Sequence, residues 1–272
     1  ARDGHLDIVR DLRANGIQCS STGANWAAVY GHLEVVRDLR ANGIHVTGDG
    51  EYVAMHGHLE VIRDLLAHGF QFSCHGANLA AENGHFNVVR ELRAHGIDCS
   101  SDGADKAAEA GDLEIVRDLR EHGVHCTTHG ANQAAVRGHL EVVRDLRAHD
   151  IHCTEAGANG AAANGHVHVI RDLRAYDIHC TPRGADQAAQ FGHLEVIRDL
   201  RAHGIHCTWR GADSAAENSH VHVLRDLRAQ GIVYDSRRRF AGGVADHAAF
   251  AGRLGMVREL RAHGHQFTSR EA

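Results

Sequence analysis

The stretch Gly138–Arg147, which reads GHLEVVRDLR, decides the fold because near-copies of it recur along the whole chain. Gly31–Arg40 repeats it without change, and Gly192–Arg201 differs only in one replacement of Val by Ile. The leading glycine returns every 27 residues at Gly84, Gly111, Gly138, Gly165 and Gly192. A fixed period of this size indicates a solenoid, in which each repeat packs on its neighbours.

The quoted stretch has the spacing of a helix. Leu140, Val143 and Leu146 fall at i, i+3 and i+6, which places them on one helical face. We predict a helix over Leu140–His149. A glycine such as Gly204, just past the helix end, would supply the left-handed cap.

A very short first helix is expected before that stretch, as in Gly130–Arg137. Asn or Asp recurs at its start, and both cap helices because the side-chain oxygen accepts a bond from an unpaired backbone N–H. Ile-His-Cys-Thr between repeats indicates an extended turn. Since neither helix is stable alone, we predict an all-α helical solenoid of about ten short repeats with extended turns between helix pairs. The predicted caps are Asn25, Asn78, Asp105, Asn132, Asn159, Asp186, Asp213 and Asp246.

The whole chain, 1–272, is expected to form a single repeat array. It divides into a partial N-terminal unit (1–22), regular repeats (23–235), an inserted loop (236–243) and a C-terminal capping unit (244–272). A polar residue, His265, stands in the last unit where Ile is usual, as fits a repeat with no neighbour beyond it. The unit that begins at Gly50 lacks one residue, and we expect a local irregularity there.

Composition limits the classes of function. The 272 residues are 43% hydrophobic, enough for a sizeable core. The net charge of −6 gives no electrostatic case for nucleic acid. No apolar run is long enough to span a membrane, and no signal-peptide pattern is present. Because the chain starts inside a repeat, we expect it to be cut from a longer protein.

Six of the seven cysteines share one repeat position, where other repeats carry Val46, Phe72, Tyr234 or Phe267. This substitution pattern indicates a buried apolar slot. Equivalent sites in stacked helices should lie about 8–10 Å apart, too far for a disulfide. We expect free thiols and an intracellular, reducing compartment. The six are Cys19, Cys99, Cys126, Cys153, Cys180 and Cys207.

The run Ala134–Val143, AAVRGHLEVV, resembles the centre of the ankyrin repeat, and the resemblance covers essentially the whole chain. The family unit is about 33 residues long, so these 27-residue repeats are short. The Thr-Pro-Leu-His start of the family's first helix is absent, which implies a first helix shortened by about one turn. A leucine-rich repeat is the alternative fold, but Val-Val-Arg-Asp-Leu-Arg indicates a helix rather than a strand.

Positions that vary between copies are the candidate partner-binding residues. They precede each Gly-Ala, follow each Asn or Asp, or follow each Ala-Ala pair. The resemblance implies that they line the concave partner-binding surface of the array. Trp, Tyr and Arg are enriched at binding hot spots. The candidates are Trp26, Tyr30, His129, Gln133, Arg137, Arg183, Gln187, Phe191, Trp209, Arg210 and Ser214, and Arg183, Phe191, Trp209 and Arg210 form the sharpest group.

The 26 histidines fall in three columns and give His-x-x-His-Cys sequences such as His149, His152 and Cys153. Specific metal binding is disfavoured, because neighbouring His and Cys in an extended turn point opposite ways and zinc needs four close ligands. A histidine near a helix C-terminus instead interacts favourably with the helix dipole. Full protonation would move the net charge from −6 to +20, so stability and binding should weaken as the pH falls through about 6.5.

Catalysis is not expected, since no nucleophile, base and orienting partner stand out from the repeated pattern. Glu141 and Arg144 form a solvated ion-pair face. The run Arg237–Arg239 is expected to be a solvated loop, with phosphate or an acidic partner as the other possibility.

Three hypotheses for function follow. The first is a non-catalytic, monomeric protein–protein interaction scaffold with no cofactor, no nucleic acid and no membrane partner. The second is the targeting part of a larger enzyme or effector whose catalytic region lies outside this chain. The third is a His- and Cys-rich metal-binding protein.

Overall fold

The computed structural model describes residues 1–48, 51–232, 248 and 252–262. The regular secondary structure of these ranges is helical, with no strand, which confirms the predicted all-α class. No helix within them is long and apolar enough to cross a membrane. The predicted inserted loop (236–243, with Arg237–Arg239), Asp246, and residues 244–247, 249–251 and 263–272 of the predicted capping unit lie outside the described residues.

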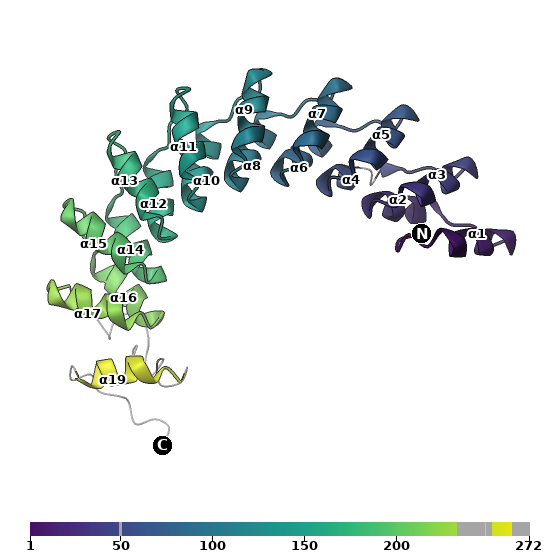
Figure 1. The fold of residues 1–272 in the computed structure, drawn as a ribbon. Helices are drawn as coiled ribbons and strands as arrows, with labels where there is room; N and C mark the ends of the chain where they lie inside the picture. Colours follow the sequence, from purple (N-terminus) through teal and green to yellow (C-terminus); the bar gives the residue numbers. More distant parts are fainter. Residues whose placement is uncertain (49–50, 233–247, 249–251, 263–272) are drawn as a thin grey trace. The chain divides into compact units, whose positions relative to one another are not determined.

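The chain forms two compact units, residues 1–130 and 131–272. In both, a repeat consists of a first helix, a tight turn and a second helix, and Figure 1 shows first and second helices in separate layers within each unit. Unit 1 begins with a lone second helix. Its helices are α1 (Leu6–Ala14), α2 (Ser21–Val29), α3 (Leu33–Ala41), α4 (Glu51–Met55), α5 (Leu59–Ala67), α6 (Cys74–Glu82), α7 (Phe86–Ala94), α8 (Ser101–Ala110) and α9 (Leu113–Glu121).

Unit 2 contains most of α10 and the helices that follow it, with first helices packed on first helices (α12 on α14, α14 on α16) and second on second (α11 on α13, α13 on α15). The helices are α10 (Thr128–Arg137), α11 (Leu140–Arg147), α12 (Glu155–Ala163), α13 (Val167–Arg174), α14 (Pro182–Phe191), α15 (Leu194–Ala202), α16 (Trp209–Glu217), α17 (Val221–Ala229) and α19 (Leu254–Ala262).

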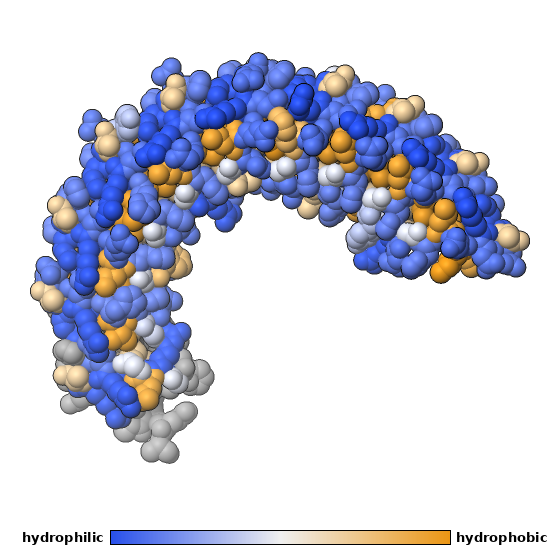
Figure 2. Space-filling view, in the orientation of Figure 1, coloured by the Kyte–Doolittle hydropathy of each residue, from blue (hydrophilic) through white to orange (hydrophobic). Residues whose placement is uncertain are grey.

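The core lies between the two helix layers. The Ala-Ala pairs of the first helices are buried, as are Val142, Val143 and Leu146 of α11, whereas the predicted core residue Leu140 is only half-buried. On the face of the molecule that Figure 2 shows, hydrophobic residues that remain visible form an interrupted orange row with hydrophilic residues on either side. Small alanine side chains let the first helices approach closely, and the larger residues of the second helices fill the remaining space.

The first helices are longer than predicted and begin earlier. The helix α10, for example, has ten residues and starts at Thr128, two residues before Gly130. The predicted Asn and Asp caps within the described residues are therefore wrong: a Ser or Thr stands at the N-cap position, as Thr154 does before α12, where its side chain accepts from the Ala156 N–H. This Ser or Thr starts the helix ahead of the Gly-Ala pair, which is why the first helices are longer than the sequence indicated.

The Asn or Asp column instead joins neighbouring repeats. Asn159 Oδ1 accepts from the backbone N–H of Thr181 at 2.9 Å, and its Nδ2 donates to Thr181 Oγ1 at 3.0 Å. Asp186 bonds Thr208 in the same way, except that the threonine hydroxyl now donates to the carboxylate. Glycine precedes Ala185 because a side chain at Gly184 would collide with Asn159 Oδ1. A buried or half-buried polar residue thus sets the register of one repeat on the next.

The turn after each second helix uses the left-handed conformation that was predicted. Gly204 has φ 80°, and Asp150 (φ 63°) and Asp177 (φ 61°) take the same conformation where two repeats lack the glycine. Aspartate is among the few non-glycine residues that tolerate it. The repeat predicted to be irregular does differ, since α4 is a single short helix of five residues.

An arginine–carboxylate ladder runs along the second helices. Asp199 of α15 accepts from Arg171 Nε at 2.7 Å and from Arg174 Nη1 at 2.8 Å, both on α13 of the preceding repeat. Equivalent pairs recur in both units, at Asp38, Asp64, Asp172, Asp226 and Glu259. Burial by itself would raise the pKa of Asp199, but the bonds from Arg174 and Arg171 bring it below its usual range. The predicted Glu141–Arg144 surface pair is also present, at 3.1 Å.

Candidate partner-binding surfaces

We use the name first-helix surface for the exposed side chains of α2, α4, α6 and α8 in unit 1, and of α10, α12, α14 and α16 in unit 2. The positions that vary between repeats point to solvent on these helices, because the Ala-Ala pair between them faces the core. Each predicted site residue is exposed or half-buried, and the set divides between the two units.

In unit 1, Trp26 and Tyr30 lie together. Their rings stack with centroids 5.8 Å apart. The Arg2 guanidinium lies over both rings and donates to the Tyr30 hydroxyl at 3.0 Å. A small apolar pocket beside Trp26 is completed by Tyr52 and His56 of the next repeat.

Tyr52 and His56 were missed by the sequence analysis. Tyr52 stands at the repeat position of Trp26, and His56 at that of Tyr30. Glu51 stands at the position where other repeats have Asn or Asp, so the correspondence was not recognised. Its Oε1 nevertheless accepts from the Ser73 N–H at 2.8 Å, just as an Asn would. A search for any residue with a side-chain oxygen at that position would have found it.

In unit 2, an open groove lies between α14 and α16 and brings together five of the predicted residues, Arg183, Gln187, Trp209, Arg210 and Ser214. Trp209 is 42% exposed, and the Arg210 guanidinium lies 5.3 Å from its ring centroid. Phe191, at the far end of α14, is 54% exposed but does not line this groove. Three members of the predicted sharpest group, Arg183, Trp209 and Arg210, therefore line one groove, and Phe191 stays a predicted contact residue outside it.

The three α10 candidates, His129, Gln133 and Arg137, do not line this groove. His129 and Arg137 are exposed, and Gln133 is half-buried. The backbone N–H of His129 bonds Thr127 Oγ1 at 3.1 Å as part of the helix start. They stay predicted contact residues.

The histidines are engaged in structural contacts. His85 Nε2 donates to the Met55 carbonyl of the preceding repeat at 2.9 Å, and at helix ends His149 Nδ1 donates to the Asp145 carbonyl at 2.8 Å. Burial lowers the pKa of His58, His166 and His220 of the first column. These rings therefore favour the neutral form, although the bond that each makes to a backbone carbonyl acts in the opposite direction and raises the pKa.

The cysteine column is buried, as predicted, except for the half-buried Cys19, and all seven cysteines are free. Cys153 Sγ donates to the Ala131 carbonyl at 3.1 Å, and burial raises the pKa of its thiol to about 12. A metal ligand would have to be a thiolate, which this environment disfavours. No group of three His, Cys, Asp or Glu side chains in the described ranges is placed to hold a metal ion.

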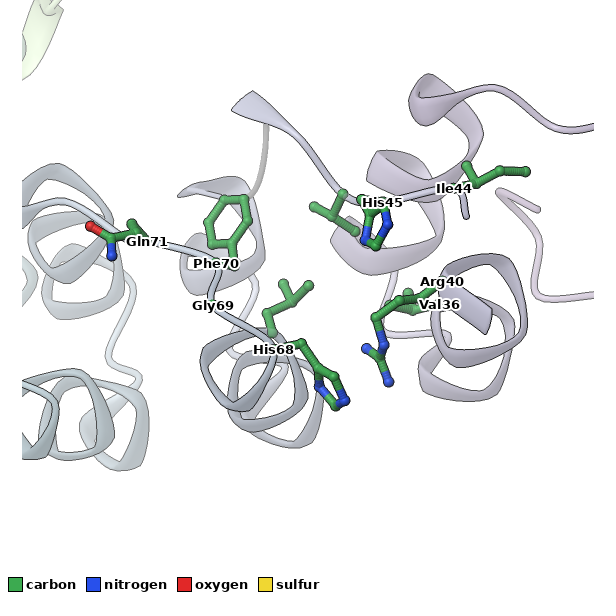
Figure 3. A pocket seen from close by; sticks show the side chains of 10 residues that line it. Val36, Arg40, Ile44, His45, His68, Gly69, Phe70 and Gln71 are labelled. Atoms are coloured by element: carbon green, nitrogen blue, oxygen red, sulfur yellow. The ribbon is translucent and has the colours of Figure 1, made fainter. Parts of the chain in front are cut away.

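A further pocket of unit 1 lies on the side of the second helices and their turns (Figure 3), with Arg40, His45, His68 and Phe70 in its lining. Its main polar groups already have partners. Arg40 Nη2 donates to Asp64 Oδ1 at 3.2 Å, and His68 Nδ1 to the Asp64 carbonyl at 2.7 Å. This pocket is therefore lined by side chains that belong to the arginine–carboxylate ladder, and it is a weaker candidate binding site than the first-helix surface.

No protein-family model and no curated protein matches the sequence. Among solved structures, the ankyrin repeat domain of human ASB11 is similar, with 18% identity over 77% of this chain and 96% of that domain, at a TM-score of 0.37. The pentatricopeptide repeat protein PPR10 from maize is similar over 97% of this chain and 48% of its own length, with 13% identity and a TM-score of 0.45. Each of the two units is a stack of helix–turn–helix repeats, the helical solenoid architecture that the sequence predicts.

Proposed function

We propose that this chain is a non-catalytic binding module whose first-helix surface contacts another protein. One observation carries the proposal: five of the six exposed aromatic side chains in the described residues belong to first helices or their ends. They are 41–54% exposed, and the sixth, Tyr176, lies on a second-helix turn against Arg147. The five are Trp26, Tyr30, Tyr52, Phe191 and Trp209.

The two helix layers differ in how their polar groups are used. Second-helix arginines are bound to carboxylates of the next repeat, whereas the first-helix surface offers aromatic rings and polar groups to solvent. Aromatic side chains contribute large contact areas to protein interfaces, and repeat arrays present extended surfaces of this kind. The free, buried thiols support a reducing, intracellular setting for the module.

Capture from a cell lysate tests the proposal. The intact chain is compared with a variant that carries Trp26→Ala, Tyr52→Ala, Phe191→Ala and Trp209→Ala. The matched control removes four exposed apolar side chains outside the first helices, with Ile8→Ala, Ile17→Ala, Tyr176→Ala and Leu254→Ala, which are 56–58% exposed. We expect a protein retained by the intact chain and the control but lost from the first-helix variant, with similar melting curves for all three. Equal retention by all three would overturn the proposal.

A further inference from the structure

The groove of unit 2 has a charge character that the rest of the described array lacks. Arg183 on α14 and Arg210 on α16 are both exposed, and neither makes an ion pair within the described residues. The arginines of α13 and α15, in contrast, are bound to Asp199 and Asp226. Arg183 and Arg210 thus lie on adjacent repeats, and neither is paired with a carboxylate. Their unpaired charge is therefore a feature of this groove and does not follow from the repeat pattern.

The one carboxylate among the lining residues of this groove already has partners. Asp186 lines the groove, but its two oxygens accept from the Thr208 backbone N–H and hydroxyl, each at 2.7 Å. Thr208 is the N-cap of α16, so this contact is part of the joint between repeats. Asp186 cannot turn toward Arg183 or Arg210 without breaking that joint, so neither arginine has a carboxylate partner, and the two arginines and one carboxylate of the lining give the groove a net charge of +1.

The same groove offers an aromatic face and polar side chains. Trp209 is partly exposed beside Arg210, so an apolar side chain placed on it would become buried without displacing a core residue. Gln187, Gln190 and Ser214 also line the groove and make no side-chain hydrogen bond within the described residues. Amide and hydroxyl groups can bond the backbone of an extended peptide.

Nucleic acid fits this arrangement less well. A nucleic-acid backbone carries a charge at every nucleotide and is bound by a continuous track of cations. The neighbouring first helix, α12, carries Glu155 and neither Arg nor Lys, so the positive charge does not continue along this surface. Positive charge confined to two residues matches a short acidic segment better.

We propose that the α14–α16 groove binds a short acidic segment of the partner protein, with its carboxylates at Arg183 and Arg210 and an apolar side chain on Trp209. This inference rests on the proposed function and names the chemistry of the partner. Both arginines occupy the first turn of their helices, whose positive dipole end also favours negative charge.

A randomised library of twelve-residue peptides, selected on the immobilised chain, tests the inference. The groove variant is Arg183→Glu with Arg210→Glu. Glutamate is well tolerated in a first helical turn, so this variant should fold. The control is Arg90→Glu with Arg258→Glu, which makes the same charge change at two exposed second-helix arginines that form no ion pair in the described residues. A parallel arm offers twelve-nucleotide single-stranded RNA.

We expect the selected peptides to be rich in Asp and Glu beside an aromatic or aliphatic residue. The affinity of these peptides for the groove variant should be lower by about tenfold or more for each ion pair lost, and their affinity for the control should be unchanged. Their affinity for the intact chain should weaken as the salt concentration rises. Peptides that are not acidic, or that bind the groove variant equally well, would overturn the inference while leaving the binding-module function standing. Preferential RNA binding, or a lysate partner with no selected peptide, would also overturn it. Absence of both a lysate partner and a selected peptide would count against both proposals.

Discussion

Gly165 shows how a single residue connects two repeats. It has φ 82°, and a Cβ added there would lie 2.7 Å from Nδ1 of His193 in the next repeat. The same contact recurs between Gly138 and His166 and between Gly192 and His220. Glycine is therefore needed at this position for two reasons, the left-handed backbone and the histidine ring that covers it.

The two reasons can be measured separately. Gly165→Ala should lower the free energy of unfolding by about 2–4 kcal/mol, the sum of a left-handed backbone cost and a steric cost. Gly204→Ala should lower it by only about 1–2 kcal/mol, because Gly204 has the same backbone conformation but no neighbouring atom within 4 Å of the added Cβ. Urea unfolding followed by circular dichroism checks both. Adding His193→Ala should relieve part of the Gly165→Ala cost, and equal costs for the two alanines would contradict this account.

At the scale of the helix, the ladder predicts different contributions from two carboxylates that share one arginine. Arg171 contacts Asp199, whose side chain is 7% exposed, and Glu195, whose side chain is 72% exposed and 3.7 Å away. Asp199→Asn leaves Arg174 without a charged partner and Arg171 with only the exposed Glu195, and it should destabilise the chain by on the order of 2 kcal/mol, between the exposed and buried extremes. Glu195→Gln should cost less than about 0.5 kcal/mol. Thermal unfolding at neutral pH measures both, and similar costs would show that burial does not strengthen the ladder.

The helix pairs could be predicted from the sequence, but the contacts between repeats could not. Period and apolar spacing are visible within one repeat, so the second helices and the left-handed turn at Gly204 were predicted correctly. Asn159 was taken for a helix cap because its partner, Thr181, lies 22 residues further along the chain. The ladder was not predicted either, because each of its carboxylates, such as Asp172 and Asp199, pairs with arginines of the preceding repeat. The sequence predicted the groove residues only as separate variable positions. The packing of neighbouring repeats and the absence of a carboxylate beside Arg183 cannot be read from the sequence of one repeat.

At the scale of the whole molecule, the histidine column predicts a pH-dependent stability. Burial lowers the pKa of His58, His166 and His220, so the unfolded chain binds more protons than the folded one just below about pH 6.5. Their contribution is fully present above that pH and is lost as the pH falls toward the lowered folded pKa. The ladder aspartates, whose pKa values are also lowered, lose theirs in a separate window below about pH 4.

Melting temperatures at pH 7.5, 6.5 and 5.5 and constant ionic strength test the upper window. Since each repeat packs only on its neighbours, the contributions of the three histidines should add, and the melting temperature should change little between pH 7.5 and 6.5 and fall between pH 6.5 and 5.5. Replacing His58, His166 and His220 by Asn should lower stability at pH 7.5, because the contacts with the preceding repeat are lost. The same replacement should make the melting temperature less dependent on pH. The control replaces the exposed histidines before the cysteines, His152, His179 and His206. Its melting temperature should depend on pH as strongly as that of the unchanged chain. If the melting temperature still depends on pH in the first variant but no longer does in the control, the histidines of the turns cause the pH dependence, and those at the contacts between repeats do not.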